Sequence, residues 1–90
     1  MENHLSDLID KIVVLDLDAP QAYVGVLKAI LPQWIILEQV IIYDPHSVQI
    51  GYEQFLVELR QHHQLPSRDK VYVNTHRVIG ITPLDAVMLP

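Results

Sequence analysis

Three apolar segments follow one another in the first half of the chain, and each is apolar on both of its alternating faces. They span residues 11–17, 22–31 and 34–43 and are dominated by Ile, Val and Leu. The breaks around Pro20 and Pro32 have turn chemistry, which predicts three successive strands. A sheet with one face in water would alternate apolar and polar residues more cleanly. The second face therefore needs a cover, which is a helix, a neighbouring subunit or the curled sheet itself.

The period-two rule predicts which side chains share a face of each strand. In the first strand, Val13, Leu15 and Leu17 oppose Ile12 and Val14. In the second, one face carries Tyr23, Gly25, Leu27, Ala29 and Leu31. In the third, Ile35, Leu37 and Ile41 oppose Trp34, Ile36, Val40 and Ile42. A glycine inside a strand, here Gly25, predicts a sharp bend or a close approach of backbone.

Residues 47–63 supply a candidate cover, because their apolar residues recur at helical spacing. These are Val48, Tyr52, Phe55, Leu56 and Leu59. Asp44 or Ser47 is the expected cap, and Gly51 weakens the helix. Arg60, His62 and His63 suit a helix C-terminus, which favours positive charge.

The remaining elements are short. Residues 4–10 are predicted to form a helix capped by Asn3, and residues 70–74 and 77–81 form strands around a tight Thr75-His76 turn. Thr82-Pro83-Leu84-Asp85 has the pattern of a capping box, which predicts one helical turn through Met88. The expected order is helix, three strands, helix, two strands and a short turn.

Composition limits the classes of function. Ninety residues make one domain, 1–90, and half of them are hydrophobic. So small a domain buries only about two-thirds of its unfolded surface, so apolar surface is expected to meet another subunit. The net charge of -5 disfavours nucleic-acid backbones. The chain has no cysteine, signal peptide or membrane-spanning segment, which predicts a cytoplasmic protein without disulfides.

The order of elements resembles the Sm-like (LSm) superfamily. Gly25 and Leu27, preceded by Tyr23, match the family's first motif, and Val73, Val78 and Ile81 match the aliphatic positions of its second. The resemblance covers about residues 4–44 and 70–82. It implies a mainly β fold with helices, a five-stranded bent antiparallel barrel with an N-terminal helix. A further helix is inserted here between strands 3 and 4. It also implies a homo-oligomeric ring in which the fourth strand of one subunit pairs with the fifth of the next.

The family's RNA-binding residues are missing, which suggests a divergent, bacterial-type member. The family usually binds uridine-rich RNA through an Asp, an Asn and an Arg-Gly pair. Those positions fall near Leu31, at about Ile35, and at Asn74 and Thr75. An apolar Ile35 has no group to hydrogen-bond a base, and Asn74 brings no charge. The fold is thus expected to carry over without the RNA site.

Other chemistry-bearing residues favour ordinary structural roles. Adjacent histidines at 62 and 63 point about 100° apart on a helix and share one metal ion poorly. Asp16 and Asp18 share a strand face, and solvated strand ends explain them more simply than acid–base work. The serines lie in capping or loop contexts, and the isolated glycines form no phosphate-binding loop. No catalytic residue, cofactor or metal is therefore expected.

Three hypotheses for function remain. The leading one is a non-enzymatic Sm-like protein that assembles into a homo-oligomer. The second is a regulator that binds short single-stranded RNA, and the third is a small protein-interaction module whose docking helix uses Tyr52 and Phe55. The candidate contacts for RNA or a partner are Trp34, Asn74, His76, Tyr72 and Arg77. Aromatic residues in this set suit either stacking on a base or an anchor in an interface.

Overall fold

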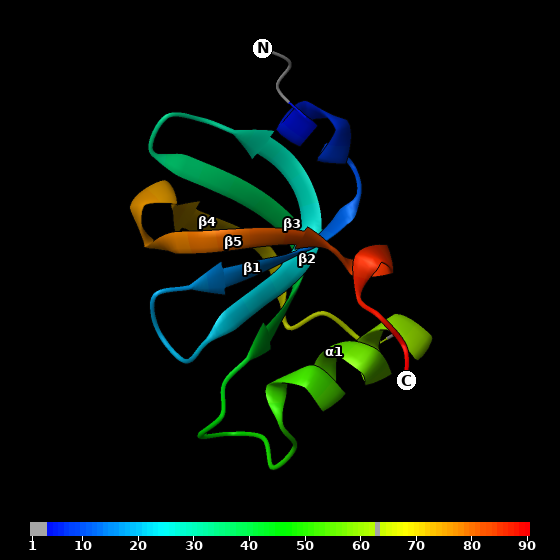
Figure 1. The fold of residues 1–90 in the computed structure, drawn as a ribbon. Helices are drawn as coiled ribbons and strands as arrows, with labels where there is room; N and C mark the ends of the chain where they lie inside the picture. Colours follow the sequence, from blue (N-terminus) through cyan, green and yellow to red (C-terminus); the bar gives the residue numbers. More distant parts are fainter. Residues whose placement is uncertain (1–3, 63) are drawn as a thin grey trace.

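The structure, a computed structural model, describes residues 4–62 and 64–90 and is mainly β. Its regular elements are β1 (Ile12–Leu17), β2 (Ala22–Ile30), β3 (Trp34–Tyr43), α1 (Tyr52–Gln61), β4 (Arg68–Asn74) and β5 (Val78–Pro83). Three short 3-10 helices complete it: η1 (His4–Leu8), η2 (Thr75–Arg77) and η3 (Leu84–Ala86). Figure 1 shows the strands curled around a common interior, with α1 placed to one side of them.

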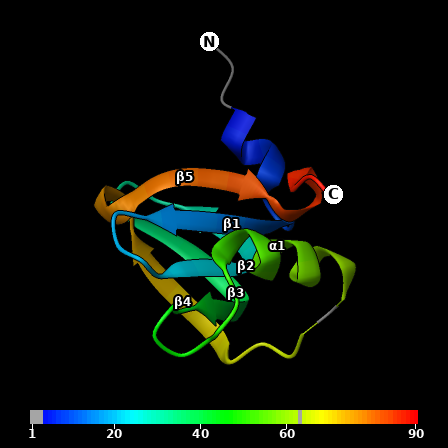
Figure 2. The same ribbon diagram turned by 60° about the horizontal axis from the view of Figure 1, so that its bottom comes forward.

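All five strands belong to one antiparallel sheet with the order β4-β3-β2-β1-β5. The sheet is strongly bent, which confirms the expected five-stranded barrel with a helix between strands 3 and 4. Because β4 and β5 stand at the two ends of this order, each has one edge without a neighbouring strand in the described sheet. A view from another side shows α1 lying across one face of the sheet (Figure 2).

The bend of the sheet is located at Gly25 and Gln39. The pairing of β2 with β3 shifts register between Val24 and Val26, as expected for a bulge. A Cβ at Gly25 would lie only 2.9 Å from the carbonyl oxygen of Glu38, so the predicted close backbone approach is present. At the same place, Gln39 has a positive φ of 54°, which is a left-handed backbone conformation. It reverses which face of the sheet each of the following side chains points to.

One hydrophobic cluster fills the inside of the barrel. Its buried members are Val13, Leu15, Leu27, Ile35, Leu37, Val40 and Val73. The predicted face of the first strand is confirmed, since Val13, Leu15 and Leu17 point inward. The predicted faces of the third strand are wrong beyond the bulge: Val40 and Ile42 join the inner cluster, while Ile41 packs outside. In β2, a second register shift brings Ile30 rather than Ala29 to the interior.

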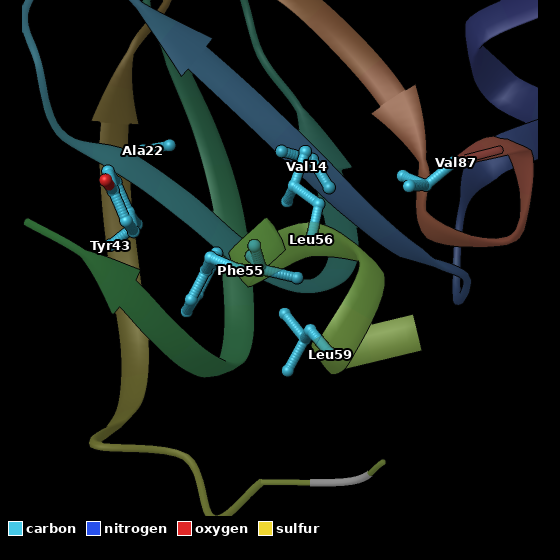
Figure 3. Packing of buried hydrophobic residues seen from close by; sticks show 8 residues of the cluster. Val14, Ala22, Tyr43, Phe55, Leu56, Leu59 and Val87 are labelled. Atoms are coloured by element: carbon cyan, nitrogen blue, oxygen red, sulfur yellow. The ribbon is translucent and has the colours of Figure 1, made fainter. Parts of the chain in front are cut away.

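A second cluster lies on the outer face of the sheet, beneath α1. Figure 3 shows Phe55, Leu56 and Leu59 of the helix against Val14, Ala22 and Tyr43 of the strands, with Val87 from the C-terminal segment. The ring of Tyr43 lies 4.9 Å from that of Phe55 and 5.2 Å from that of Tyr52. A helix therefore covers part of the second apolar face, as the sequence required.

The helix is shorter than predicted. It begins after Gly51, which is extended and makes no side-chain cap, and it ends before His62. Asp44 instead caps a separate turn, where its carboxylate accepts a hydrogen bond from the backbone N–H of His46. Val48 lies outside the helix but still packs against the outer cluster. The predictions for Asn3 and His63 fall outside the described residues.

The other boundaries differ by one or two residues. The N-terminal element is a 3-10 helix ending at Leu8, and the turn after β4 is a 3-10 helix that includes Arg77. The strands β4 and β5 are longer than predicted. The capping box at Thr82 is wrong, because Thr82 and Pro83 continue β5, where Thr82 pairs with Val14 and Pro83 with Val13.

Candidate assembly interface

The end of β4, the start of β3 and the turn between β1 and β2 line a groove of about 370 Å³, which we call the edge groove. Its lining comprises Leu17, Ala19, Gln21, Tyr23, Trp34, Tyr72, Val73, Asn74 and Arg77. Four of the five residues singled out as contacts in the sequence, Trp34, Tyr72, Asn74 and Arg77, meet here. His76 lies in the adjoining turn and does not line the groove. Trp34 is 41% exposed and Tyr72 is 56% exposed, so large aromatic surface faces solvent at the groove.

Two turns hold the residues of the edge groove in place. The backbone N–H of Thr75 donates to the carbonyl of Gln33, and its hydroxyl donates to the carbonyl of Pro32, both at 3.0 Å. These bonds join the turn between β2 and β3 to the turn after β4. Trp34 and Asn74 are direct partners in the β3–β4 ladder, so the aromatic ring and the amide lie on neighbouring strands.

An ion pair joins Arg77, which lines the edge groove, to Asp18. The guanidinium Nε of Arg77 donates to Asp18 Oδ1 at 2.6 Å, and the backbone N–H of Asp18 donates to the carbonyl of Arg77 at 3.0 Å. Both side chains are well exposed, so the pair contributes at most about 1 kcal/mol. Its main consequence is that the one cation lining the groove is already neutralised by a carboxylate.

At the positions that match the RNA contacts of Sm-like proteins, the side chains here are apolar or already hydrogen-bonded within the chain. Ile35 is 3% exposed and belongs to the inner cluster, so it does not reach a ligand. Leu31 is exposed but has no polar side-chain group. The amide oxygen of Asn74 accepts the backbone N–H of His76, and the Thr75 hydroxyl is bound to Pro32. The loss of the RNA site stays a prediction, which a binding measurement with RNA tests.

The edge strand β5 has no charged side chain to protect its free edge. Natural edge strands carry charges, bulges or covers, because unpaired N–H and C=O groups invite other strands. The six residues of β5 include no charged side chain, and Ile79 is 73% exposed. Pro83 blocks its last position and a bulge lies near Ile79, but Val78–Thr82 presents an apolar, pairable edge. In β4, charges occupy only the first three residues, Arg68, Asp69 and Lys70.

Asp16 and Asp18 do not act together. Asp18 binds Arg77, whereas Asp16 accepts a hydrogen bond from the hydroxyl of Tyr52 through its Oδ1. Burial raises the pKa of Tyr52, and the hydrogen bond and charge of Asp16 raise it further. The phenol thus remains protonated and holds α1 to the end of β1. This bond could not be predicted from the sequence, since the two residues are 36 positions apart.

The side chains proposed for a docking helix point into the protein. Phe55 is 4% exposed in the outer cluster, and Tyr52 is half-buried with its hydroxyl on Asp16. Both hold α1 on the sheet, so neither presents a free docking surface. The exposed side of the helix is polar and carries Glu53, Gln54 and Arg60.

Within residues 4–62 and 64–90, no three His, Cys, Asp or Glu side chains gather where they could hold a metal ion. Over the same residues, none of the helices has the length and apolarity needed to cross a bilayer.

Comparison with known proteins places the fold. No protein-family model matches the sequence, and no curated protein matches it significantly. Among solved structures, an Sm protein of Pyrococcus abyssii in complex with a uridine heptamer aligns with a TM-score of 0.60 at 17% identity. That alignment covers 91% of this chain and 99% of the Sm protein. The chain therefore has the Sm-like fold predicted from its sequence.

Chains from a multi-subunit complex align equally well. One from the NatC complex bound to CoA has a TM-score of 0.59 at 20% identity, covering 92% of this chain and 87% of its own length. One from the NatC complex bound to Gag peptide and CoA has a TM-score of 0.56 at 22% identity, with 87% of both chains covered. Likeness at this level of identity concerns the fold.

Proposed function

We propose that the chain is a non-enzymatic, self-assembling subunit in which the β5 edge of one copy pairs with the β4 edge of the next. The observation that carries this proposal is the pair of free edges at opposite ends of one sheet, each with exposed apolar side chains. Ile79 on an uncharged β5 is the clearest case. A second strand would pair its backbone groups and remove this surface from water.

The two edges are different, so the contact is of the head-to-tail kind. Each copy offers one β4 and one β5, and a head-to-tail contact continues until a ring closes. The edge groove supports this pairing, because the uncharged β4 residues Tyr72, Val73 and Asn74 line it. A strand paired with β4 would cover Tyr72, which is 56% exposed. Closure would leave no unpaired edge in the assembly.

A different protein that supplies the second strand is the alternative partner. The likeness to chains of the NatC complex supports it, since those chains belong to a complex. A hetero-complex would use the same strand edges. Light scattering would then give a molar mass equal to the sum of this chain and its partner when the two are mixed. Without a partner, such a protein would remain monomeric.

An RNA-associated role has weaker support. The uridine heptamer bound by the Sm protein of similar fold favours it. The net charge of -5, the neutralised Arg77 and the buried Ile35 oppose it. Fluorescence anisotropy with a short uridine-rich RNA at low salt tests this role, and an unchanged signal at high protein concentration would reject it.

The direct test places a charge on the β5 edge. We expect Ile79→Lys to convert the assembly to a monomer without unfolding it, because Ile79 lacks cover within one copy. Size-exclusion chromatography with light scattering gives the mass, and circular dichroism checks the fold. The control is Leu65→Lys, which changes a leucine that is 92% exposed, against 73% for Ile79, in the segment before β4. Equal masses for wild type and Ile79→Lys would reject edge pairing.

A further inference from the structure

We infer that Asp16 is a binding site for the ammonium group of Lys70 from a second copy, reached across Gly80. This inference rests on the proposed pairing of β5 with β4 and names a polar contact that would fix how the two copies are placed. It starts from the Asp16 carboxylate, of which one oxygen is hydrogen-bonded within the copy and the other is available to a further donor.

Tyr52 of α1 positions the Asp16 carboxylate from the outer face of the sheet. The phenol hydroxyl donates to Oδ1, and the raised pKa of Tyr52 keeps that donor in place. Among the described residues, Oδ2 has no hydrogen-bond partner. A group with N–H donors and positive charge is what a half-buried carboxylate of this kind would bind.

Gly80 leaves the approach to Oδ2 open. Asp16 and Gly80 are direct partners in the β1–β5 ladder, and a Cβ at Gly80 would lie 3.5 Å from Oδ2. Any longer side chain at this position would stand between the carboxylate and a strand added beyond β5. The space forms a notch of about 380 Å³ whose walls include Leu17, Pro20, Ala22 and Ile79. Such apolar walls suit the stem of a lysine and leave its charge for the carboxylate.

Strand spacing makes the contact reachable. Neighbouring strands lie about 4.8 Å apart, so a strand added beyond β5 lies about 10 Å from β1. Lysine has a flexible four-carbon stem. A lysine on the added strand and an aspartate on β1 can therefore meet across β5, where the residue between them is a glycine. The occupant of the notch therefore has to be a long basic side chain on the added strand.

The chain's own β4 carries such a residue at the right place. Antiparallel addition continues the pattern of the sheet, and it would set the uncharged residues 71–74 of β4 against the uncharged β5 edge. Lys70 is the first cation beyond that stretch and would lie beside or diagonal to Gly80, within reach of a long side chain. Within one copy Lys70 is weakly held, with Glu38 Oε2 3.8 Å away and both side chains exposed. Arg68 lies two residues further along and would fall past the end of β5.

The experiment is a double-mutant cycle on assembly, made with the full chain. Asp16→Asn keeps an acceptor for Tyr52 but removes the charge, and Lys70→Gln removes the cation. Sedimentation at low and high salt gives the dissociation constant of the assembly for each single variant and for the double variant. Arg68→Gln is the matched control, since it removes a neighbouring positive charge from the same strand. Circular dichroism melts show that each variant folds.

We expect each single change at Asp16 or Lys70 to raise the dissociation constant by roughly tenfold or more, with a weaker dependence on salt. The double variant should bind no more weakly than either single, and Arg68→Gln should assemble like wild type. The exchange Asp16→Lys with Lys70→Asp should restore part of the affinity. Additive single effects, or single variants that assemble like wild type, would overturn the Asp16 site and leave edge pairing standing. A monomeric wild type would overturn both.

Discussion

The two halves of the sheet surface differ in how much of their apolar surface the chain itself covers. At one half, apolar residues on the outer face, such as Val14 and Tyr43, are buried under Phe55 and its neighbours on α1. At the other half, Trp34, Tyr72 and Ile79 remain exposed next to free strand edges. The chain thus carries its own cover for one half only. The proposed assembly would place a second strand at the uncovered half, and the following changes test that division.

The largest effect is expected when the cover is removed. Phe55→Ala deletes a ring that is buried against Tyr43, so it should lower the free energy of unfolding by about 3–5 kcal/mol. Urea denaturation followed by circular dichroism measures this. Glu53→Ala, on the exposed side of the same helix, should change stability by no more than about 0.5 kcal/mol. A loss below about 1 kcal/mol at Phe55 would mean that α1 is not a part of the core.

The bend between the two halves should also resist change. Gly25→Ala would bring a Cβ to 2.9 Å from the Glu38 carbonyl, a backbone atom held in the ladder. We expect a loss of about 2–3 kcal/mol in the free energy of unfolding. Gly51→Ala is the matched control, because nothing lies within 4 Å of a Cβ there. The same urea titrations decide, and equal stabilities of the two variants would show that the close approach at Gly25 is not needed.

The bond between α1 and β1 should give a smaller, pH-dependent effect. Tyr52→Phe removes the hydroxyl that donates to Asp16 and should lower the free energy of unfolding by about 1–1.5 kcal/mol at neutral pH. The folded protein raises the pKa of Tyr52 above its ordinary value of 10.0. The protonated phenol is thus favoured in the folded state, so its contribution is complete below pH 10.0 and is lost as the pH rises beyond it.

Stability curves against pH check this sign. The difference in the free energy of unfolding between wild type and Tyr52→Phe should be constant below about pH 9 and shrink above about pH 10. A difference that grows with alkaline pH would contradict a protonated donor at Asp16. Because the other tyrosines are present in both proteins, their titration cancels in the comparison.

The smallest effect is expected at the uncovered half. Arg77→Gln breaks the ion pair with Asp18, in which both side chains are exposed, and should cost no more than about 1 kcal/mol. Thermal melts at low and high salt measure this, and the small difference should vanish at high salt. A loss above about 2 kcal/mol would show that the turns around the edge groove are a part of the folding core.

The sequence predicted the sheet well because strands and their breaks have local causes. Apolar runs bounded by Pro20 and Pro32 define three strands, and Gly25 marks the bend. The faces of β3 could not be predicted past Gln39, since its positive φ leaves no compositional signal in a glutamine. The start of α1 was misplaced because Asp44 and Ser47 suit a turn as well as a helix cap.

The sequence pointed to the candidate contacts one residue at a time. The structure brings Trp34, Tyr72, Asn74 and Arg77 to one groove, and their contact with RNA or a partner stays a prediction. Asp16, Tyr52 and Gly80 come from three distant segments, and only folding places them side by side. Phe55 was predicted to lie on a helix that covers the sheet, but helical spacing alone did not distinguish this core face from a docking face.

The molar mass of the wild-type chain in solution tests the central claim most directly. Light scattering at micromolar concentration should give a whole-number multiple of the 10.3 kDa protomer, with three or more copies if the head-to-tail contact closes a ring. A single mass of 10.3 kDa across the concentration range would contradict the account, because the exposed β5 edge would then have no partner of its own kind.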